Sequence, residues 1–173
     1  SLAQPPELAV VGPPNKGKSS IVSTLAWDLS VEIDAVSGTT KVAQPIPMQV
    51  DGRTLYTLID TPGFQRARAT LDWLKQHADS PGDRPEALRA FVQAFDKSDR
   101  FRDEVELLRP IVNGAGVVYV VDGSVPPGDA YEAELEILRW SGRPRLAVIN
   151  PIDGEAFTEK WKNILSQYLG TVV

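Results

Sequence analysis

The sequence GPPNKGKS, residues 12–19, decides the fold of this chain. It fits the pattern G-x-x-x-x-G-K-[ST] of the phosphate-binding P-loop, whose backbone N–H groups surround an anion. The apolar run at residues 8–11 suits a buried strand, and residues 20–27 have spacing compatible with a helix. A strand, a glycine loop and a helix in this order place a phosphate group on the unpaired N–H groups of the helix N-terminus.

Composition limits the classes of protein that the chain can belong to. It has 173 residues, which is enough for one domain. Its net charge of −5 argues against an extended nucleic-acid surface. It has no cysteine and a single histidine, so a cysteine or multi-histidine metal site is excluded. The histidine, His77, is interpreted as a surface residue. Neither a signal peptide nor an apolar run of about 18 residues is visible, so we expect a cytoplasmic protein.

Short apolar runs alternate with helical patterns along the chain, which favours an α/β fold with a mostly parallel sheet. The run at 42–50 contains two prolines, so it should be an antiparallel edge strand, joined to the next strand by the turn at 51–53. The predicted strands are 8–11, 42–50, 54–60, 116–122 and 144–150, and the predicted helices are about 19–28, 67–78, 85–96, 101–112, 129–141 and 155–169.

Residues 64–110 form a long helical interval between two strands. Leu88, Phe91, Val92 and Phe95 are spaced as one buried helix face. We interpret the interval as an insertion of two or three helices. It either packs on the sheet as additional core or forms an element that binds a partner next to the phosphate site.

The P-loop motif assigns a role to each of its residues. Lys18 is predicted to contact the phosphates during catalysis, and the hydroxyl of Ser19 to bind Mg²⁺. Gly12 and Gly17 allow the tight backbone path of the loop. The N–H groups that form the phosphate cradle are those of Asn15, Lys16, Gly17, Lys18, Ser19 and Ser20.

A second motif, DTPG at residues 60–63, follows a predicted strand. In P-loop hydrolases a carboxylate at a strand end holds Mg²⁺ through water, and a glycine N–H contacts the γ-phosphate. These roles fall to Asp60 and Gly63.

Together GPPNKGKS, SGTT (residues 37–40) and DTPG resemble the small GTPases of the Era/TrmE class. The resemblance covers residues 7–63 and 116–153 and implies a P-loop NTPase fold of three α/β/α layers, with the helical insertion after switch II. SGTT lies where switch I belongs, and Thr40, with Thr39 as the alternative, would complete the Mg²⁺ shell in the GTP state.

The insertion is also similar to a bacterial branch of this class whose C-terminal region associates with membrane. The resemblance further implies that residues 1–173 are a single G domain cut short at its C-terminus, because the family's base-supporting loop and final helix do not follow residue 169.

The family reads guanine with the motif N-K-x-D, and here the sequence is NPID, residues 150–153. Asn150 and Asp153 keep their spacing, and the aspartate can accept hydrogen bonds from guanine. Pro151 replaces the lysine that covers the base. We expect guanine recognition with weakened affinity, and the alternative is an Asn-Pro turn that reads no base.

The catalytic residues depart from the Ras pattern, because Phe64 stands where Ras-like enzymes place the glutamine that orients water, and Gln65 follows it. Slow hydrolysis is therefore expected. Asn15 matches the residue that helps TrmE-like members bind K⁺ as an activating ion. Arg66 and Arg68 are either solvated residues at a helix start or groups that act in trans across a dimer.

The sequence thus predicts a nucleotide switch that binds GTP and GDP with Mg²⁺, with K⁺ as a further expected ion. The alternatives are a nucleotide-gated scaffold without useful turnover and an ATPase. A nucleotide-dependent dimer, a protein partner of the insertion and membrane contact through other regions are expectations from the resemblance. Glu132, Glu134 and Glu136 are predicted to form a solvated helix surface.

Overall fold

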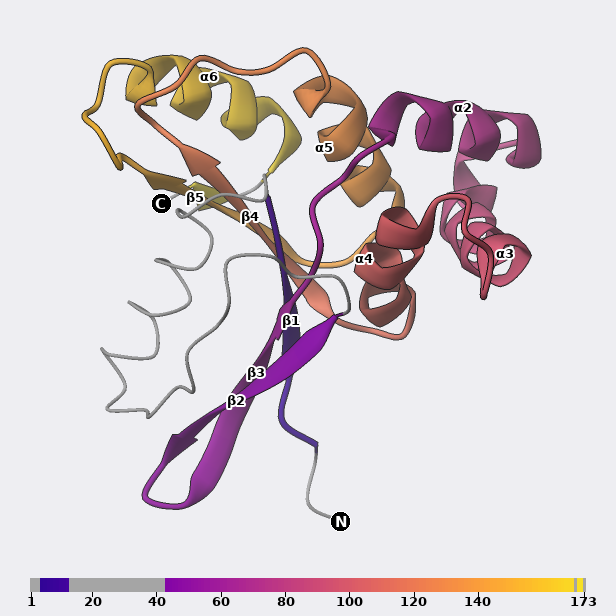
Figure 1. Cartoon of the computed structure of the whole chain (residues 1–173), viewed down its shortest axis with the longest axis horizontal. Helices are drawn as coiled ribbons and strands as arrows, with labels where there is room; N and C mark the ends of the chain where they lie inside the picture. The colour runs from indigo at the N-terminus through magenta and orange to yellow at the C-terminus, as the bar shows by residue number, and fades with distance from the viewer. Residues whose placement is uncertain (1–3, 13–42, 170, 173) are drawn as a thin grey trace.

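The computed structural model describes residues 4–12, 43–169 and 171–172, which form a twisted sheet covered by helices (Figure 1). The six strands in this part of the chain have the order β2-β3-β1-β4-β5-β6. Only β2 runs antiparallel to its neighbour, β3. The strands are β1 (Glu7–Val11), β2 (Gln44–Val50), β3 (Arg53–Asp60), β4 (Gly116–Asp122), β5 (Arg145–Asn150) and β6 (Thr171–Val172).

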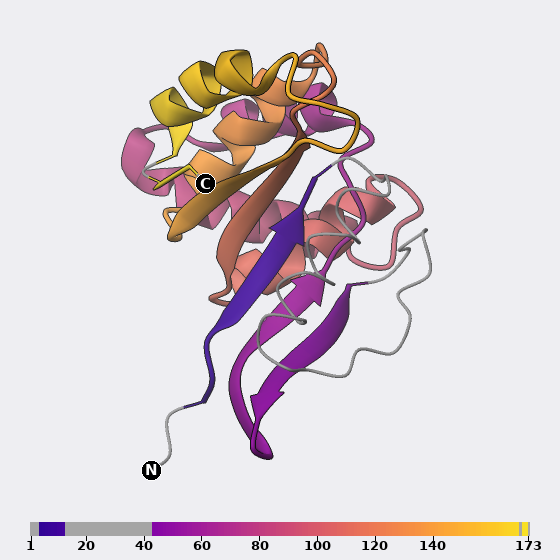
Figure 2. The same ribbon diagram turned by 90° about the vertical axis from the view of Figure 1, so that its left-hand side faces the viewer.

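The described helices lie together against one face of this sheet, as Figure 2 shows from the side. The sequence prediction of a mostly parallel α/β fold is confirmed, and each predicted element from residue 43 to residue 169 is present. The two-residue β6 was not predicted. The helices are α2 (Ala67–His77), the short 3₁₀ helix η1 (Pro81–Asp83), α3 (Arg84–Phe95), α4 (Arg102–Val112), α5 (Tyr131–Trp140) and α6 (Thr158–Tyr168).

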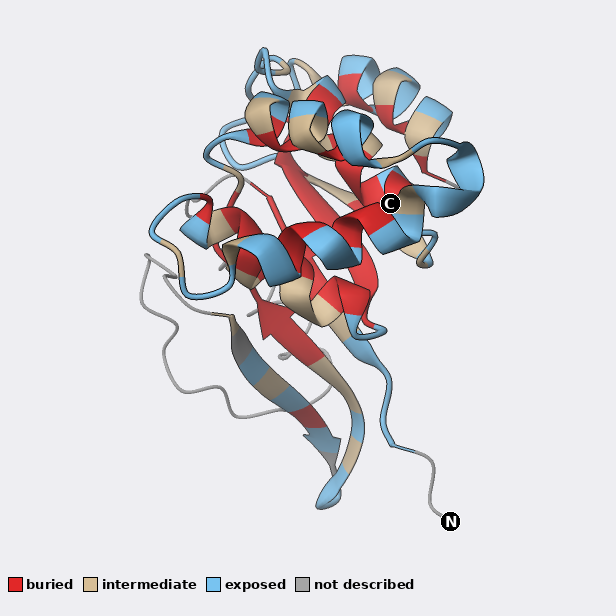
Figure 3. Ribbon diagram, turned by 90° about the vertical axis from the view of Figure 1, so that its right-hand side faces the viewer, coloured by how far each residue is buried: buried red, intermediate tan, exposed pale blue. Residues whose placement is uncertain are grey.

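Buried residues concentrate on the central strands and on the inner sides of the helices (Figure 3). All seven residues of β4 are buried, as is typical of a central strand of a parallel sheet. The larger apolar cluster joins the sheet to the helices, and a smaller one, which contains Val10, Met48 and Leu58, belongs to the other face.

Strand β2 forms one edge of the sheet that the described residues build. Its prolines, Pro45 and Pro47, pair with Ile59 and Thr57 of β3 without interrupting the ladder. Proline has no N–H to donate, so an uninterrupted ladder requires that both missing donors belong to the side facing away from β3. The prediction of an antiparallel edge strand is therefore confirmed.

The helical interval after β3 packs around an aromatic cluster. Phe91 contacts Trp73, Phe95 and Phe101, with ring centroids 5.0 to 5.4 Å apart. Most of these rings meet edge to face, which is the favoured geometry for aromatic pairs. These contacts make the interval an extension of the core. None of the helices in the described part of the chain is long and apolar enough to cross a membrane.

Candidate functional site

The carboxyl ends of the parallel strands bring the predicted site residues to one edge of the sheet. Gly12 follows β1, while Asp60, Asp122 and Asn150 are the last residues of β3, β4 and β5. The register pairs Val10 with Asp60, and Asp122 with Asn150. In open α/β sheets ligands bind at this edge, so the fold places DTPG and NPID on either side of the strand that leads into the P-loop.

Gly12 is the first glycine of the P-loop motif and passes close to the neighbouring strand. A Cβ atom on it would lie 2.5 Å from the carbonyl oxygen of Val120, which is closer than real Cβ contacts allow. Because the obstacle is backbone of a buried central strand, it cannot swing aside. Only glycine lets the chain leave β1 along this path.

The DTPG segment is held at both ends. The Thr61 hydroxyl donates a hydrogen bond of 2.8 Å to the carbonyl oxygen of Val10 in β1. Three residues beyond Gly63, the N–H of Arg66 donates to Oε1 of Glu104 at 2.7 Å. Asp60, at the start of the segment, is only 2% exposed. The segment is therefore fixed against β1 on one side and against α4 on the other.

Glu104 is a functional candidate that the sequence analysis did not identify. Its side chain is buried, and burial raises the pKa of its carboxyl above the ordinary value although backbone N–H groups work in the opposite direction. Its helical spacing from Leu108 and Ile111, four and seven residues later, places it on the apolar face of α4. A carboxylate at such a position was the signal available in the sequence.

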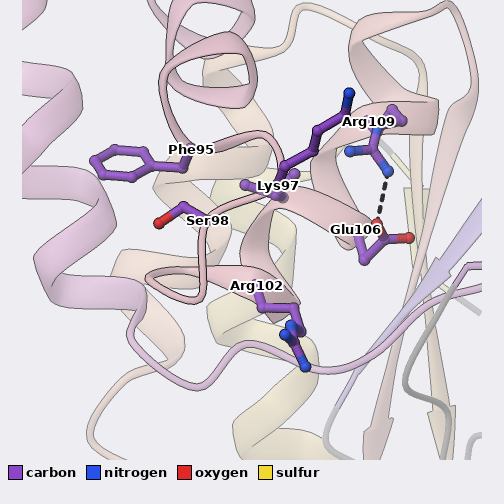
Figure 4. Close-up of a pocket in the computed structure, with 7 residues that line it drawn as sticks. Phe95, Lys97, Ser98, Arg102, Glu106 and Arg109 are labelled. Carbon is purple, nitrogen blue, oxygen red and sulfur yellow. Dashed lines mark hydrogen bonds and ion pairs between the residues drawn. The ribbon is translucent and has the colours of Figure 1, made fainter.

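The same helix also contacts the residue that precedes β2. The N–H of Ala43 donates to Oε2 of Glu106 at 3.4 Å. Glu106 lines a cavity of about 370 Å³ between α3 and α4, in which Arg109 pairs with it at 2.6 Å (Figure 4). Arg109 also pairs with Asp96, and Arg102 with Asp99. Both arginines of the cavity are thus paired with carboxylates, and Lys97 is its other basic lining residue.

The NPID segment is tied to the residues that follow β4. Gly123 N–H donates to the Asn150 carbonyl at 3.0 Å, and Phe157 N–H donates to the Gly123 carbonyl at 2.9 Å. Asp153 is exposed at the surface, as a residue that meets a base must be. Asp153 therefore stands on a short loop that begins after Asn150, the last residue of β5, and this region is tied to the end of β4.

Asp122 is the side chain that fastens this loop, and the sequence analysis did not identify it. Its Oδ1 accepts hydrogen bonds from the N–H of Ser124 at 2.8 Å, from the Ser124 hydroxyl and from the N–H of Ile152 at 3.4 Å. Burial alone would raise the pKa of Asp122, but these hydrogen bonds hold it below the ordinary value. An aspartate at the carboxyl end of a central parallel strand was a signal available in the sequence.

Replacing Asp122 with alanine is expected to weaken GDP binding by about tenfold, because the NPID loop loses an anchoring charge-assisted hydrogen bond. Calorimetric titration with GDP and Mg²⁺ measures the change. Asp122→Asn keeps an oxygen acceptor at the same place and should bind GDP nearly as the parent does. GDP affinity in Asp122→Ala equal to that of the parent would show that the loop is positioned by other contacts.

The residues after DTPG are engaged within the chain. Phe64 is half-buried and packs against the main core, whereas Gln65 is exposed. Arg66 lies 4.9 Å from the centroid of the Phe101 ring. Arg68 donates from Nη2 to the carbonyl oxygen of Asp129 at 2.6 Å. Phe64 thus occupies the position of the Ras glutamine with a side chain that faces the core.

One sequence prediction is wrong. Glu132 is exposed as predicted, but Glu134 is largely buried and accepts a hydrogen bond of 3.1 Å from the Tyr119 hydroxyl. Glu136, also half-buried, accepts from the indole N–H of Trp140. Tyr119 of β4 reaches Glu134 through a tertiary contact that the spacing of the glutamates does not show, whereas Trp140 lies one helical turn after Glu136 in α5.

The remaining predicted site residues lie outside the described part of the chain, as does the predicted helix at 19–28. Among the described residues no group of three or more His, Asp or Glu side chains could hold a metal ion. The undescribed site residues are Asn15, Lys16, Gly17, Lys18, Ser19, Ser20 and Thr40 with its alternative Thr39.

Comparison with known proteins agrees with this arrangement. The chain is 38% identical over 98 residues to GTPase Der of Pelotomaculum thermopropionicum, and the aligned region covers 55% of this chain and 20% of that protein. It is 30% identical over 173 residues to GTPase Der of Pseudoalteromonas atlantica, and the aligned region covers 99% of this chain and 30% of that protein. A crystal structure of an Aquifex aeolicus Era variant bound to GDP and AlF₄⁻ shares the fold, with a TM-score of 0.54 and 16% identity over 99% of this chain and 50% of that one.

The chain therefore spans less than a third of the length of these two Der proteins. The family model described as "50S ribosome-binding GTPase" matches residues 7–151, which include the P-loop motif, DTPG and the start of NPID. Since this match extends over most of the sequence and confirms the Era-like resemblance, the chain belongs to the family of 50S ribosome-binding GTPases.

Proposed function

We propose that this chain binds GTP and GDP with Mg²⁺, hydrolyses GTP slowly and acts as a nucleotide switch. The observation that carries the proposal is the attachment of DTPG at both of its ends, to Val10 by Thr61 and to Glu104 by Arg66. A segment held in this way sits beside the exit of β1 into the P-loop. Gly63 would then offer its N–H to the γ-phosphate, and Lys18 its ammonium group to the β- and γ-phosphates.

The residues at the sheet edge fit a magnesium ion. Asp60 is a nearly fully buried carboxylate next to β1 in the register, and Mg²⁺ prefers oxygen ligands of this kind. Ser19 and, in the GTP state, Thr40 would supply hydroxyl oxygens, while Asp60 would act through water. When bound, the ion would neutralise charge on the phosphates.

Guanine recognition is assigned to NPID. Asn150 ends β5 and Asp153 stands on the loop after it, which Asp122 and Gly123 tie to the end of β4, so the base reader would lie at the same sheet edge as the proposed phosphate site. Asp153 would accept hydrogen bonds from guanine, which adenine cannot provide. Pro151 lacks the lysine stem that covers the base, which lowers the expected affinity without changing the specificity.

Base specificity is tested by calorimetric titration of the chain with GDP, a non-hydrolysable GTP analogue and ATP in the presence of Mg²⁺. The parent should bind the guanine nucleotides only. Asp153→Ala should weaken GDP binding at least about tenfold, since guanine loses a charged hydrogen-bond partner. Asp72→Ala, at an exposed position of α2, is the matched control and should leave GDP affinity unchanged. Equal binding of ATP and GDP would favour the ATPase alternative.

Turnover is expected to be slow because Phe64 faces the core and cannot orient water. In single-turnover experiments we expect a hydrolysis rate on the order of 10⁻³ s⁻¹ or below without an activator. K⁺ in place of Na⁺ should raise this rate if Asn15 takes part in binding the ion. Guanine binding without hydrolysis in either salt would instead support a nucleotide-gated scaffold, which the packing of Phe64 also favours.

The helical interval at 64–110 is proposed as the element through which the domain reports its nucleotide state. In α4, Glu104 accepts a hydrogen bond from the N–H of Arg66, which follows DTPG. Glu106 accepts one from the N–H of Ala43, which precedes β2. Ordering and release of the switch segments by the γ-phosphate would therefore reach α4 directly. A cytoplasmic protein partner at this interval and a nucleotide-dependent dimer belong to the same proposal.

A further inference from the structure

A second cavity lies under the loop at 123–130, between β4, α5 and α6, and the proposed function does not use it. Its volume is about 310 Å³, at the lower end of the range of small-molecule sites. Tyr119 and Glu134 lie among its lining residues, together with the aromatic rings of Tyr131 and Trp161. The two rings meet edge to face, with centroids 5.8 Å apart.

The carboxylate of Glu134 is the group of interest in this cavity. Among the described residues it accepts one hydrogen bond, from the Tyr119 hydroxyl at 3.1 Å. Burial raises the pKa of Glu134 to about 7, although the hydrogen bond from Tyr119 lowers it. A largely buried carboxylate with so few partners is a strong acceptor for a cation that can reach it.

The charges around Glu134 all have the same sign. Asp122 of β4 and Asp129 of the loop also line the cavity, and no lysine or arginine stands among its described lining residues. Asp122 is already engaged with Ser124 and Ile152. Arg68 of α2 is occupied by the Asp129 carbonyl oxygen. The described residues thus show no basic partner for the carboxylates of Glu134 and Asp129, and Glu134 is the less exposed of the two.

The aromatic walls suit the same kind of ligand. A cation near the face of a tryptophan or tyrosine ring is attracted by the ring, and its alkyl part can be buried against the apolar surface. The indole N–H of Trp161 donates to the carbonyl oxygen of Val125 at 2.9 Å and so fastens the loop that closes the cavity. A ligand in the cavity should therefore change the NMR signal of this indole N–H.

We propose that this cavity binds an organic cation, whose ammonium or guanidinium group pairs with Glu134 while its apolar part packs against Tyr131 and Trp161. The ligand is either a free small amine or a basic side chain of another protein. The cavity shares Asp122 with the support of the NPID loop, but Glu134, Tyr131 and Trp161 have no role in the proposed nucleotide site, so failure of this proposal would leave the proposed GTPase function untouched.

The test follows the ¹⁵N-labelled indole of Trp161 by NMR while n-butylammonium is added to the GDP-bound chain. We expect a saturable shift that the neutral isostere 1-butanol produces only weakly. The tripeptide Ac-Gly-Lys-Gly-NH₂ distinguishes the two sources. Binding of both cations supports the side chain of a protein as a ligand, and binding of n-butylammonium alone supports a free amine.

Glu134→Gln keeps the shape of the cavity and an acceptor for Tyr119, and it should weaken n-butylammonium binding at least about tenfold. Tyr119→Phe removes only the phenolic hydroxyl group, and this variant should still bind the cation. In the parent, affinity should rise about tenfold from pH 6 to pH 8 as Glu134 ionises, and this rise should vanish in Glu134→Gln. Binding that is equal for 1-butanol, unchanged in Glu134→Gln or absent for both cations would overturn the proposal.

Discussion

Gly12→Ala is expected to weaken GDP binding by about 100-fold, because displacement of a phosphate-binding backbone by about 1 Å has effects of this size. The added methyl group would lie 2.5 Å from the carbonyl oxygen of Val120, which belongs to a buried strand. Since the strand cannot move, the chain leaving β1 must. Calorimetric titration with GDP and Mg²⁺ measures the loss, and a thermal unfolding curve shows whether the variant is folded.

Gly128→Ala is the matched control for this prediction. The same methyl group at Gly128 would meet no atom within 4 Å, so GDP affinity should stay at the level of the parent. A Gly12→Ala protein that binds GDP as tightly as Gly128→Ala would show that the start of the P-loop can move without affecting the phosphate site. In that case the glycine at this position would serve packing alone.

Glu134→Gln is expected to flatten the pH dependence of stability between about pH 4.5 and pH 7. In the folded chain burial raises the pKa of Glu134 from its ordinary value of 4.5 to about 7, so the native state binds more protons than the unfolded state over this interval. The free energy of unfolding of the parent must therefore fall as pH rises through it and level off above pH 7. At about 1.4 kcal/mol per pH unit, the interval corresponds to about 3 kcal/mol.

Urea unfolding of the parent and the variant at pH 4.5, 6 and 8 measures this effect, and the difference between the two curves isolates Glu134 from other groups. Glu159→Gln is the control, because Glu159 is a largely exposed residue of α6 whose pair with Lys162 spans 3.9 Å. Its curve should run parallel to that of the parent. A constant difference between the parent and Glu134→Gln at all three pH values would show that the carboxyl of Glu134 does not titrate in this range.

Much of the fold was predictable from the sequence because local signals agree with the tertiary structure. The apolar runs give β1, β3, β4 and β5, and the prolines of β2 mark it correctly as an edge strand. Strand β6 was not predicted, since its two residues carry too little pattern. The buried face of α3 followed from helical spacing, which the structure confirms for Leu88, Phe91 and Val92, while Phe95 is half-buried.

The candidate site was predictable where a motif stands for a backbone geometry. DTPG and NPID do lie at the carboxyl edge of the sheet, as their positions after strands indicated. Their supports were not predictable, because each depends on a partner far away in the sequence. Arg66 meets Glu104 across 38 residues, and Ile152 meets Asp122 across 30. Glu134 was misinterpreted for the same reason, since Tyr119 reaches it from another element.

The two prolines of β2 also bear on how copies of this domain can meet. A strand arriving from a second molecule needs a row of N–H donors along the edge, and at Pro45 and Pro47 two of them are missing on the outer side. A continuous sheet formed through β2 of two copies is therefore disfavoured, and so is aggregation through this edge. Self-association of the domain would have to use a surface other than the β2 edge.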